Sequence, residues 1–331
     1  MVKASPRVVL ITNPAPMAQP RLSPKQNWSF SYLTTADFMP EGEEPSRRLN
    51  VFAQTDKAPS KDVARLTMRL WEMNRRILGI DHAEKYENRQ VDIYLCDQGS
   101  AGGEQVFEHD GRNHEFNSIY IYDIQNFGSN VELAREVCHE YGHATLPPIG
   151  GYTSPEYWAN GLMGEKLYMR WLRDQLDAGL LKPSDTCGAD IVSLRQFVRD
   201  EVDPLILRAA SAPQKEEALK PGSQTTMDNF LGLMLEAYSV LPNKVFGRTF
   251  ALIGNGQPAD YPKAIRDSVV EAGNGKFHVP DLLKKAPFWF PFGEKVRFEG
   301  NIKILEQDGI WTKVQVIGPG PYLINVGASG S

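Results

Sequence analysis

The sequence has few cysteines and no long apolar run. Its three cysteines, Cys96, Cys138 and Cys187, are too few for a disulfide framework, and at most one bridge could form. No apolar stretch approaches the roughly 18 residues of a membrane-spanning helix. The run Arg7 to Ile11 is too short for a signal-peptide core and reads as a strand. A secreted or periplasmic location is expected only if a preceding signal peptide has been removed.

The chain also lacks a strong charge bias and several common catalytic motifs. It has 36 Lys and Arg against 41 Asp and Glu, a net charge of −5, and no basic cluster. Nucleic acid is therefore not an expected partner. There is no glycine-rich nucleotide-binding motif and no Gly-x-Ser-x-Gly elbow. The 331 residues are enough for two or three units with their own cores.

One short motif, His139-Glu140-Tyr141-Gly142-His143, carries most of the functional information. Histidines at i and i+4 lie on one face of a helix, about one turn apart, so both imidazoles can reach one zinc ion. Glu140 projects nearby without being a ligand, and from there it can accept a proton from a water that the metal activates. The alternative is a helix whose surface histidines have this spacing by chance.

The flanking sequence predicts that the motif is helical. Ser129 and Glu132 form a capping box, and apolar residues then recur at helical spacing from Val131 to Leu146. Pro147 and Pro148 end the helix. On this helix Cys138 points away from the metal face, so we expect it to be a small core residue.

A zinc site with two histidines needs a third protein ligand. The metzincin pattern would place glycine at 146 and histidine at 149, and Leu146 and Ile149 exclude it. Ser154-Pro155 predicts the start of a second helix that runs to about Leu176.

Glu165 is the predicted third ligand, because it falls in the middle of the apolar stripe of this second helix. A carboxylate on a buried face needs a cation partner, and zinc would be one. A core salt bridge, for example to Arg135, is the alternative. The competing Glu156 would project on the opposite face, in the first helical turn.

The stretch Glu136 to Leu172 resembles the active-site core of gluzincin-type zinc metallopeptidases, the group that contains thermolysin and the zinc aminopeptidases. Glu165 follows His143 by 22 positions, and Gly164-Glu165-Lys166-Leu167 is similar to the group's Asn-Glu-Gly-Leu/Phe stretch. Gly164 replaces the usual asparagine, and Met169 stands where thermolysin-like enzymes have an aspartate. An alternative alignment of Trp158 to Gly161 with the aminopeptidase Trp-x-Asn-Glu-Gly leaves no glutamate at the ligand position.

The order of elements predicts an α+β fold with a zincin-like catalytic domain, a helical subdomain and a small C-terminal β module. Strands are expected at 7–11, 28–32, 49–54, 91–96 and 118–122, a helix at 60–78, loops at 12–26, 38–47 and 97–117, and short strands after 287. We therefore predict an N-terminal β and loop region at 1–48, the metallopeptidase domain at 49–286 and the β module at 287–331. The resemblance implies that Ile119 to Tyr122 is the edge strand that pairs with substrate.

These residues together predict a zinc-dependent hydrolase that cleaves a peptide or protein substrate, with His139, His143 and Glu165 as zinc ligands and Glu140 as general base. Attack of water on the peptide carbonyl produces a tetrahedral oxyanion, which needs one more hydrogen-bond donor. Tyr238 and His278 are the candidates for this donor. The alternative function is a zincin-like protein that binds a protein or glycan without cleaving it.

Overall fold

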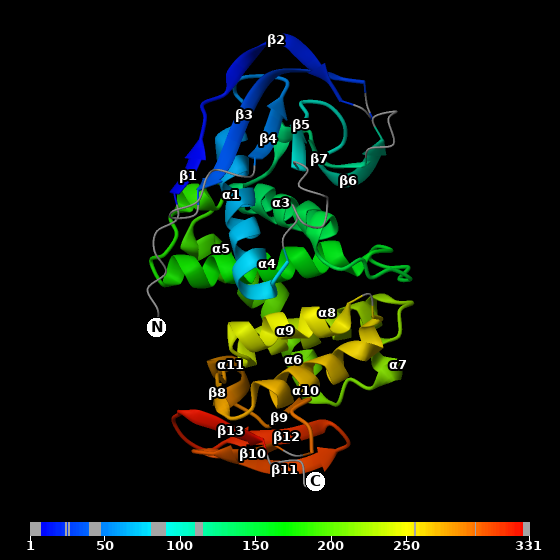
Figure 1. The fold of residues 1–331 in the computed structure, drawn as a ribbon, viewed down its shortest axis with the longest axis vertical. Helices are drawn as coiled ribbons and strands as arrows, with labels where there is room; N and C mark the ends of the chain where they lie inside the picture. Colours follow the sequence, from blue (N-terminus) through cyan, green and yellow to red (C-terminus); the bar gives the residue numbers. More distant parts are fainter. Residues whose placement is uncertain are drawn as a thin grey trace. The chain divides into compact units, whose positions relative to one another are not determined.

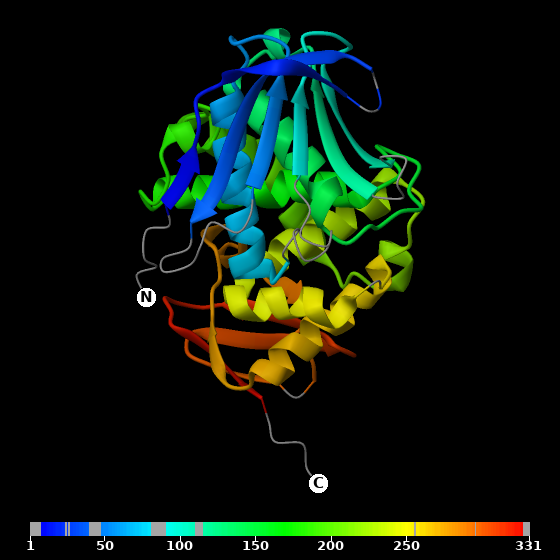
Figure 2. The same ribbon diagram turned by 45° about the horizontal axis from the view of Figure 1, so that its top comes forward.

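The structure is a computed structural model that describes residues 8–23, 25, 27–39, 48–80, 91–109, 115–254, 256–294 and 296–326 (Figures 1 and 2). It contains a mixed sheet, α-helices and two small antiparallel sheets near the C-terminus. The residues group into two compact units. The first comprises Met1–Arg75, Ile80–Leu146 and Tyr168–Gln196, and the second Arg76–Gly79, Pro147–Leu167 and Phe197–Ser331.

A seven-stranded sheet forms the framework of the first unit, in the order β1-β3-β4-β5-β7-β6, with β2 paired to β3. Its β4–β5 and β5–β7 pairs are parallel and the others antiparallel. The strands are β1 (Val8–Ile11), β2 (Ala15–Leu22), β3 (Ser29–Met39), β4 (Arg48–Ala53), β5 (Val91–Leu95), β6 (Gly102–His109) and β7 (Glu115–Tyr122). All five residues of β5 are buried, as expected for a central parallel strand.

The two faces of this sheet are covered differently. Phe52, Tyr94 and Tyr120 lie side by side on β4, β5 and β7, with ring centroids 5.2 Å and 4.8 Å apart. Arg21 of β2 lies over the Phe52 ring on that face. Successive side chains in a strand alternate between faces, and Asn117 of β7 donates from the other face to the Ala144 carbonyl. Helices α1 (Ser60–Met73) and α3 (Asn130–Thr145) contact this other face of the sheet (Figure 2).

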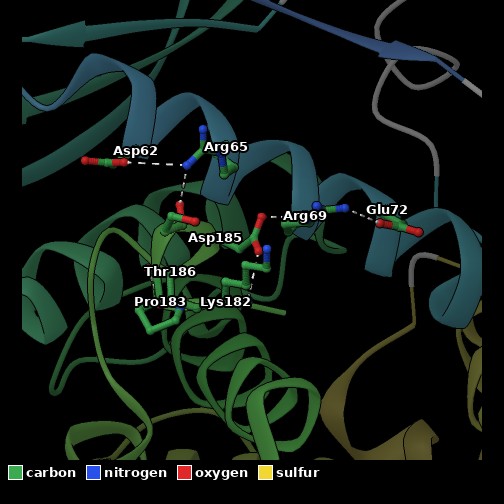
Figure 3. Close-up of polar contacts among 9 residues, drawn as sticks. Asp62, Arg65, Arg69, Glu72, Lys182, Pro183, Asp185 and Thr186 are labelled. Carbon is green, nitrogen blue, oxygen red and sulfur yellow. Dashed lines mark hydrogen bonds and ion pairs between the residues drawn. The ribbon is translucent and has the colours of Figure 1, made fainter. Parts of the chain in front are cut away.

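An ion pair joins α1 to the segment that follows α4 (Ala159–Asp177). Arg69 donates to Asp185 at 3.0 Å and to Glu72 at 3.3 Å (Figure 3). The second Asp185 oxygen accepts from the backbone N–H of Lys182 at 2.9 Å. Asp185 lies in the short 3-10 helix η3 (Pro183–Asp185), so both of its oxygens hold this segment in place.

A buried polar cluster fixes the end of α3. The Tyr168 hydroxyl of α4 donates to Asn74 at 2.9 Å and lies 3.2 Å from the Thr145 hydroxyl. Asn74 in turn donates to Thr145 at 3.0 Å. Asn74 begins η1 (Asn74–Leu78), a π-helical turn that continues α1. Three helical segments, η1, α3 and α4, thus share hydrogen bonds next to the C-terminus of the motif helix.

The second unit is helical, with two small sheets. α6 (Asp203–Ser211) and α8 (Gln224–Val240) approach closely at Gly232, where a Cβ atom would lie 2.2 Å from the Leu205 carbonyl oxygen. The sheets have the strand orders β10-β13-β8 and β11-β12-β9. The remaining elements of the described residues, in both units, are η2 (Ile124–Asn126), α5 (Ile191–Phe197), η4 (Val198–Val202), α7 (Glu216–Leu219), α9 (Asn243–Ile253), η5 (Pro258–Asp260), α10 (Tyr261–Ala272), β8 (Gly275–Phe277), α11 (Asp281–Lys284), β9 (Phe288–Phe290), β10 (Val296–Glu299), β11 (Ile302–Asp308), β12 (Trp311–Val316) and β13 (Tyr322–Val326).

The structure corrects three expectations. Two segments expected to be loops contain strands, β2 in 12–26 and β6 in 97–117, because both pair with a neighbouring strand. As a result β7 is paired on both sides, by β5 and β6, and the prediction that 119–122 is an edge strand is wrong. The second helix begins at Ala159 and not after Ser154, because the preceding segment closes into a loop in which Ala159 donates to the Ile149 carbonyl.

The mixed α and β architecture and the small C-terminal sheets match the expected fold class, whereas its zincin-like character stays a prediction. The domain limits 1–48, 49–286 and 287–331 also stay predictions. Among the described residues, no helix has the length and apolarity that a membrane crossing requires.

Candidate metal centre

Helix α3 carries the His-Glu-x-x-His motif and begins as the sequence predicts. Ser129 is the N-cap, and its hydroxyl accepts from the Glu132 N–H at 3.3 Å. Such a cap satisfies a backbone donor that the first helical turn leaves without an intrahelical partner. The helix ends at Thr145, before the Pro147-Pro148 pair. Cys138 is a buried core residue, as expected.

The two histidines of the motif face each other. Their Nε2 atoms are 3.1 Å apart, and the rings meet nearly edge to face with centroids 4.8 Å apart. Both side chains are half-buried. Two imidazole nitrogens that converge in this way offer two ligand atoms to one ion, while the remaining exposure leaves room for water.

Glu156 supplies the carboxylate that the structure places with this pair. The ligand atoms of His139, His143 and Glu156 all lie within 4.8 Å of one another, so the three residues can hold a metal ion. Glu156 is in the loop before α4, not in a first helical turn. Because Glu156 is not helical, helical periodicity does not place its side chain on the face opposite Glu165.

Glu165 lies on α4 and is buried, as its place in the apolar stripe predicts. It is not in the group formed by the two histidines and Glu156. One of its oxygens accepts from Nζ of Lys166 at 2.9 Å, and the same ammonium group is 3.1 Å from Glu201. The Glu165 carboxylate therefore has a cationic neighbour, the Lys166 ammonium group, whether or not a metal is bound. The role of Glu165 as a zinc ligand stays a prediction.

Glu140 is buried on α3 and lies against strand β6. A Cβ atom at Gly103 would be 2.9 Å from Oε1 of Glu140 and 2.8 Å from Oε1 of Glu136. The absence of a side chain at position 103 therefore allows the motif helix to approach β6. The sequence signal was the Gly102-Gly103 pair, which sequence reasoning treated only as part of a loop.

The remaining candidates, Tyr238 and His278, lie in the second unit. Tyr238, on α8, is half-buried and packs edge to face on Phe246 at 5.6 Å between centroids. His278 is exposed, and its backbone N–H donates to the Val240 carbonyl. Their assignment as oxyanion donors stays a prediction.

None of the three cysteines forms a disulfide bond, and all three are buried. Burial is the main cause that raises the pKa of the Cys96 thiol to about 12, and the nearby Asp97 carboxylate adds to it. Burial likewise raises the pKa of the Cys187 thiol. Both groups are therefore protonated near neutral pH, and a protonated thiol is neither a nucleophile nor a metal ligand.

No protein-family model matches this chain, and a comparison with curated proteins finds no match.

Proposed function

We propose that this chain is a zinc-dependent hydrolase that cleaves peptide bonds, with a gluzincin-like active site. The observation that carries the proposal is the convergence of His139, His143 and Glu156 within 4.8 Å, on and near a helix that also bears Glu140. Metal binding alone does not need a glutamate next to the first histidine, whereas hydrolysis does.

The donor set fits zinc. Imidazole nitrogen and carboxylate oxygen are common zinc ligands, and two histidines with one carboxylate form a known type of catalytic site with an open fourth position. Zinc–nitrogen bonds of about 2.0–2.1 Å in tetrahedral geometry place two ligand nitrogens about 3.3 Å apart. The Nε2 separation of 3.1 Å is close to this value. When bound, zinc would lower the pKa of a water molecule and polarise the scissile carbonyl.

We propose Glu156 as the third ligand, in place of the Glu165 that helical periodicity favoured. Glu156 shares a ligand group with the histidines, whereas Glu165 accepts a hydrogen bond from Lys166. A zinc ligand should be deprotonated and directed at the ion, and Glu156 offers a carboxylate oxygen within 4.8 Å of the two histidine nitrogens. Glu165 then has a structural role, through its ion pair with Lys166.

Glu140 acts as general base and then as general acid. Its carboxylate accepts a proton from the attacking water and afterwards returns it to the leaving amine. The burial of Glu140 and the close approach of β6 at Gly103 limit the positions that the carboxylate can adopt. A base held in one orientation contributes more to the rate than a mobile one.

Extended substrate would pair with β6, and not with β7. In the described sheet β6 is the terminal strand, with β7 on one side only. An edge strand of this kind can hydrogen-bond to a peptide main chain. Pairing next to Gly103 would bring the peptide backbone beside Glu140.

The test combines metal analysis with peptide turnover. We expect about one zinc per chain and hydrolysis of a mixed peptide library by the wild-type protein. Glu140→Gln should keep the zinc and abolish turnover. Glu132→Gln, on the same helix but exposed in its first turn, is the matched control and should retain activity.

Two results would contradict the proposal. Wild-type turnover by Glu140→Gln would remove Glu140 from the mechanism. Zinc binding without any hydrolysis by the wild-type protein would favour the alternative, a binding protein that does not cleave its partner.

A further inference from the structure

Two neighbouring aromatic side chains, Tyr157 and Trp158, are exposed and directly follow the candidate metal ligand Glu156 in the sequence. The exposed fraction is 57% for Tyr157 and 46% for Trp158. Within the described part of the chain, the other large apolar side chains that are exposed are all aliphatic. Single exposed aliphatic residues are normal, but two adjoining aromatic rings offer a larger apolar surface of the kind that recognition sites use.

The two rings form a defined arrangement. They meet edge to face, with centroids 5.0 Å apart and an angle of 76° between their planes. Gly150 lies beneath both rings, because a Cβ atom there would be 2.7 Å from ring atoms of each. Position 150 must therefore lack a side chain for the rings to lie as they do.

The loop that carries the rings is closed by main-chain and side-chain hydrogen bonds. Ala159 donates to the Ile149 carbonyl at 2.8 Å, and Tyr152 donates to the Tyr157 carbonyl at 3.3 Å. The Thr153 hydroxyl donates to the Gly222 carbonyl at 2.7 Å. A loop fixed in this way loses little conformational entropy when a ligand binds, so its exposed rings are a preorganised surface.

The position of the rings relates them to the proposed chemistry. Tyr157 directly follows Glu156, whose carboxylate lies in the group with the two histidines. The Thr153 hydroxyl donates within the protein, and Glu156 belongs to the metal group. The exposed Tyr157 and Trp158 rings are thus next in sequence to a carboxylate of the candidate metal group.

We propose that Tyr157 and Trp158 form a specificity subsite that binds a bulky apolar side chain of the peptide substrate, preferably an aromatic one. This inference rests on the proposed peptidase function. An aromatic side chain placed against this pair would gain both apolar burial and edge-to-face contacts. A small side chain such as alanine would gain little of either, so the enzyme should discriminate between them.

The test compares two peptides that differ only in one side chain, phenylalanine or alanine, at the position that a library identifies as selective. We expect the wild-type protein to prefer the phenylalanine peptide by about tenfold or more in kcat/KM. Trp158→Ala and Tyr157→Ala should lower this ratio at least about fivefold, with zinc content unchanged. Gly150→Ala should lower it too, since its methyl group displaces the rings.

A binding measurement provides a readout without turnover. In the Glu140→Gln background, titration calorimetry should give tighter binding of the phenylalanine peptide than of the alanine peptide, and Trp158→Ala should remove the difference. Val192→Ala, which trims an exposed apolar residue of α5, is the control and should leave the preference intact.

The outcomes separate the two proposals. Peptide hydrolysis with an undiminished aromatic preference in Trp158→Ala and Tyr157→Ala would overturn the subsite while leaving the peptidase proposal in place. Absence of any peptide hydrolysis, or binding of a hexasaccharide of N-acetylglucosamine in place of the peptides, would overturn both.

Discussion

A Cβ atom at Gly103 on β6 would lie 2.6 Å from Cγ of Glu140 on α3. This close approach links the edge strand of the sheet directly to the proposed general base. Real Cβ atoms do not come this near to a neighbouring carbon, so any larger residue at position 103 must displace either the strand or the glutamate.

We expect Gly103→Ala to lower kcat by about tenfold to a hundredfold, because a displaced Glu140 loses its alignment with the attacking water. Zinc content should be unchanged, since neither histidine is touched. Peptide turnover and metal analysis on the same sample provide the measurement. Gly275→Ala is the control, because no atom lies within 4 Å of a Cβ there. An active Gly103→Ala protein would show that Glu140 tolerates the shift or is not the base.

Replacing each candidate carboxylate ligand in turn should identify the third one. We expect Glu156→Gln to weaken zinc binding by more than about a hundredfold, because even groups around the ligands alter affinity by up to that factor. Glu165→Gln should retain zinc and lose thermal stability, as its ion pair with Lys166 is removed. Competition with a chelator of known affinity measures both. The reverse pattern would restore Glu165 as the ligand.

The ion pair between Arg69 and Asp185 should contribute measurably to stability. Arg69→Met leaves the Asp185 carboxylate at a site where its side chain is 9% exposed, and we expect a loss of about 1–3 kcal/mol in the free energy of unfolding. Arg248→Met breaks the exposed pair with Glu271 and should change stability by no more than about 0.5 kcal/mol. Urea denaturation of both variants tests the contrast, and equal effects would contradict it.

Glu236 should make the stability of the protein depend on pH. Its side chain on α8 is fully buried, and neither oxygen has a hydrogen-bond partner among the described residues. Burial raises the pKa of this carboxyl group well above its ordinary value. The folded protein then keeps a proton that the unfolded chain has lost. The folded state is therefore most stable below the pKa that Glu236 has in the unfolded chain. This stability is lost as pH rises through the higher pKa that Glu236 has in the folded protein.

Glu236→Gln stays neutral at every pH and should therefore lack this decline. We expect the variant to melt higher than wild type at pH 8, by about 2–4 °C for each kcal/mol gained, and nearer to wild type at pH 4. Calorimetric scans across this range provide the comparison. Glu217→Gln, in exposed α7, should follow the wild-type curve. Parallel curves for Glu236→Gln and wild type would mean that Glu236 is ionised in the folded protein.

The sequence predicted the elements whose signals are local. The cap at Ser129, the apolar spacing and the two prolines were sufficient to define α3, and β5 followed from its alternating pattern and β-propensity. β6 escaped prediction because its polar and glycine-rich sequence becomes a strand only through pairing with β7. β-propensity depends on such neighbours more than helix propensity does.

The candidate site was likewise predictable only where its sequence signal is local. His139, Glu140 and His143 have fixed spacing on one helix, so their relation follows from helical geometry. The sequence placed Glu156 in a helical turn because the helix was expected to start after Ser154, whereas it begins at Ala159, after a loop in which Ala159 donates to the Ile149 carbonyl. Neither this bond nor the contact of Gly150 with Tyr157 and Trp158 leaves a periodic pattern in the sequence.

Helix α4 belongs to both compact units, with Ala159 to Leu167 in one and Tyr168 to Asp177 in the other. Each unit is also assembled from three separate stretches of the chain. A truncation or recombination breakpoint at any single peptide bond between Arg75 and Phe197 would therefore leave at least one unit incomplete. A single cut in this part of the chain cannot separate the two units, unlike a cut in the linker between two sequential domains.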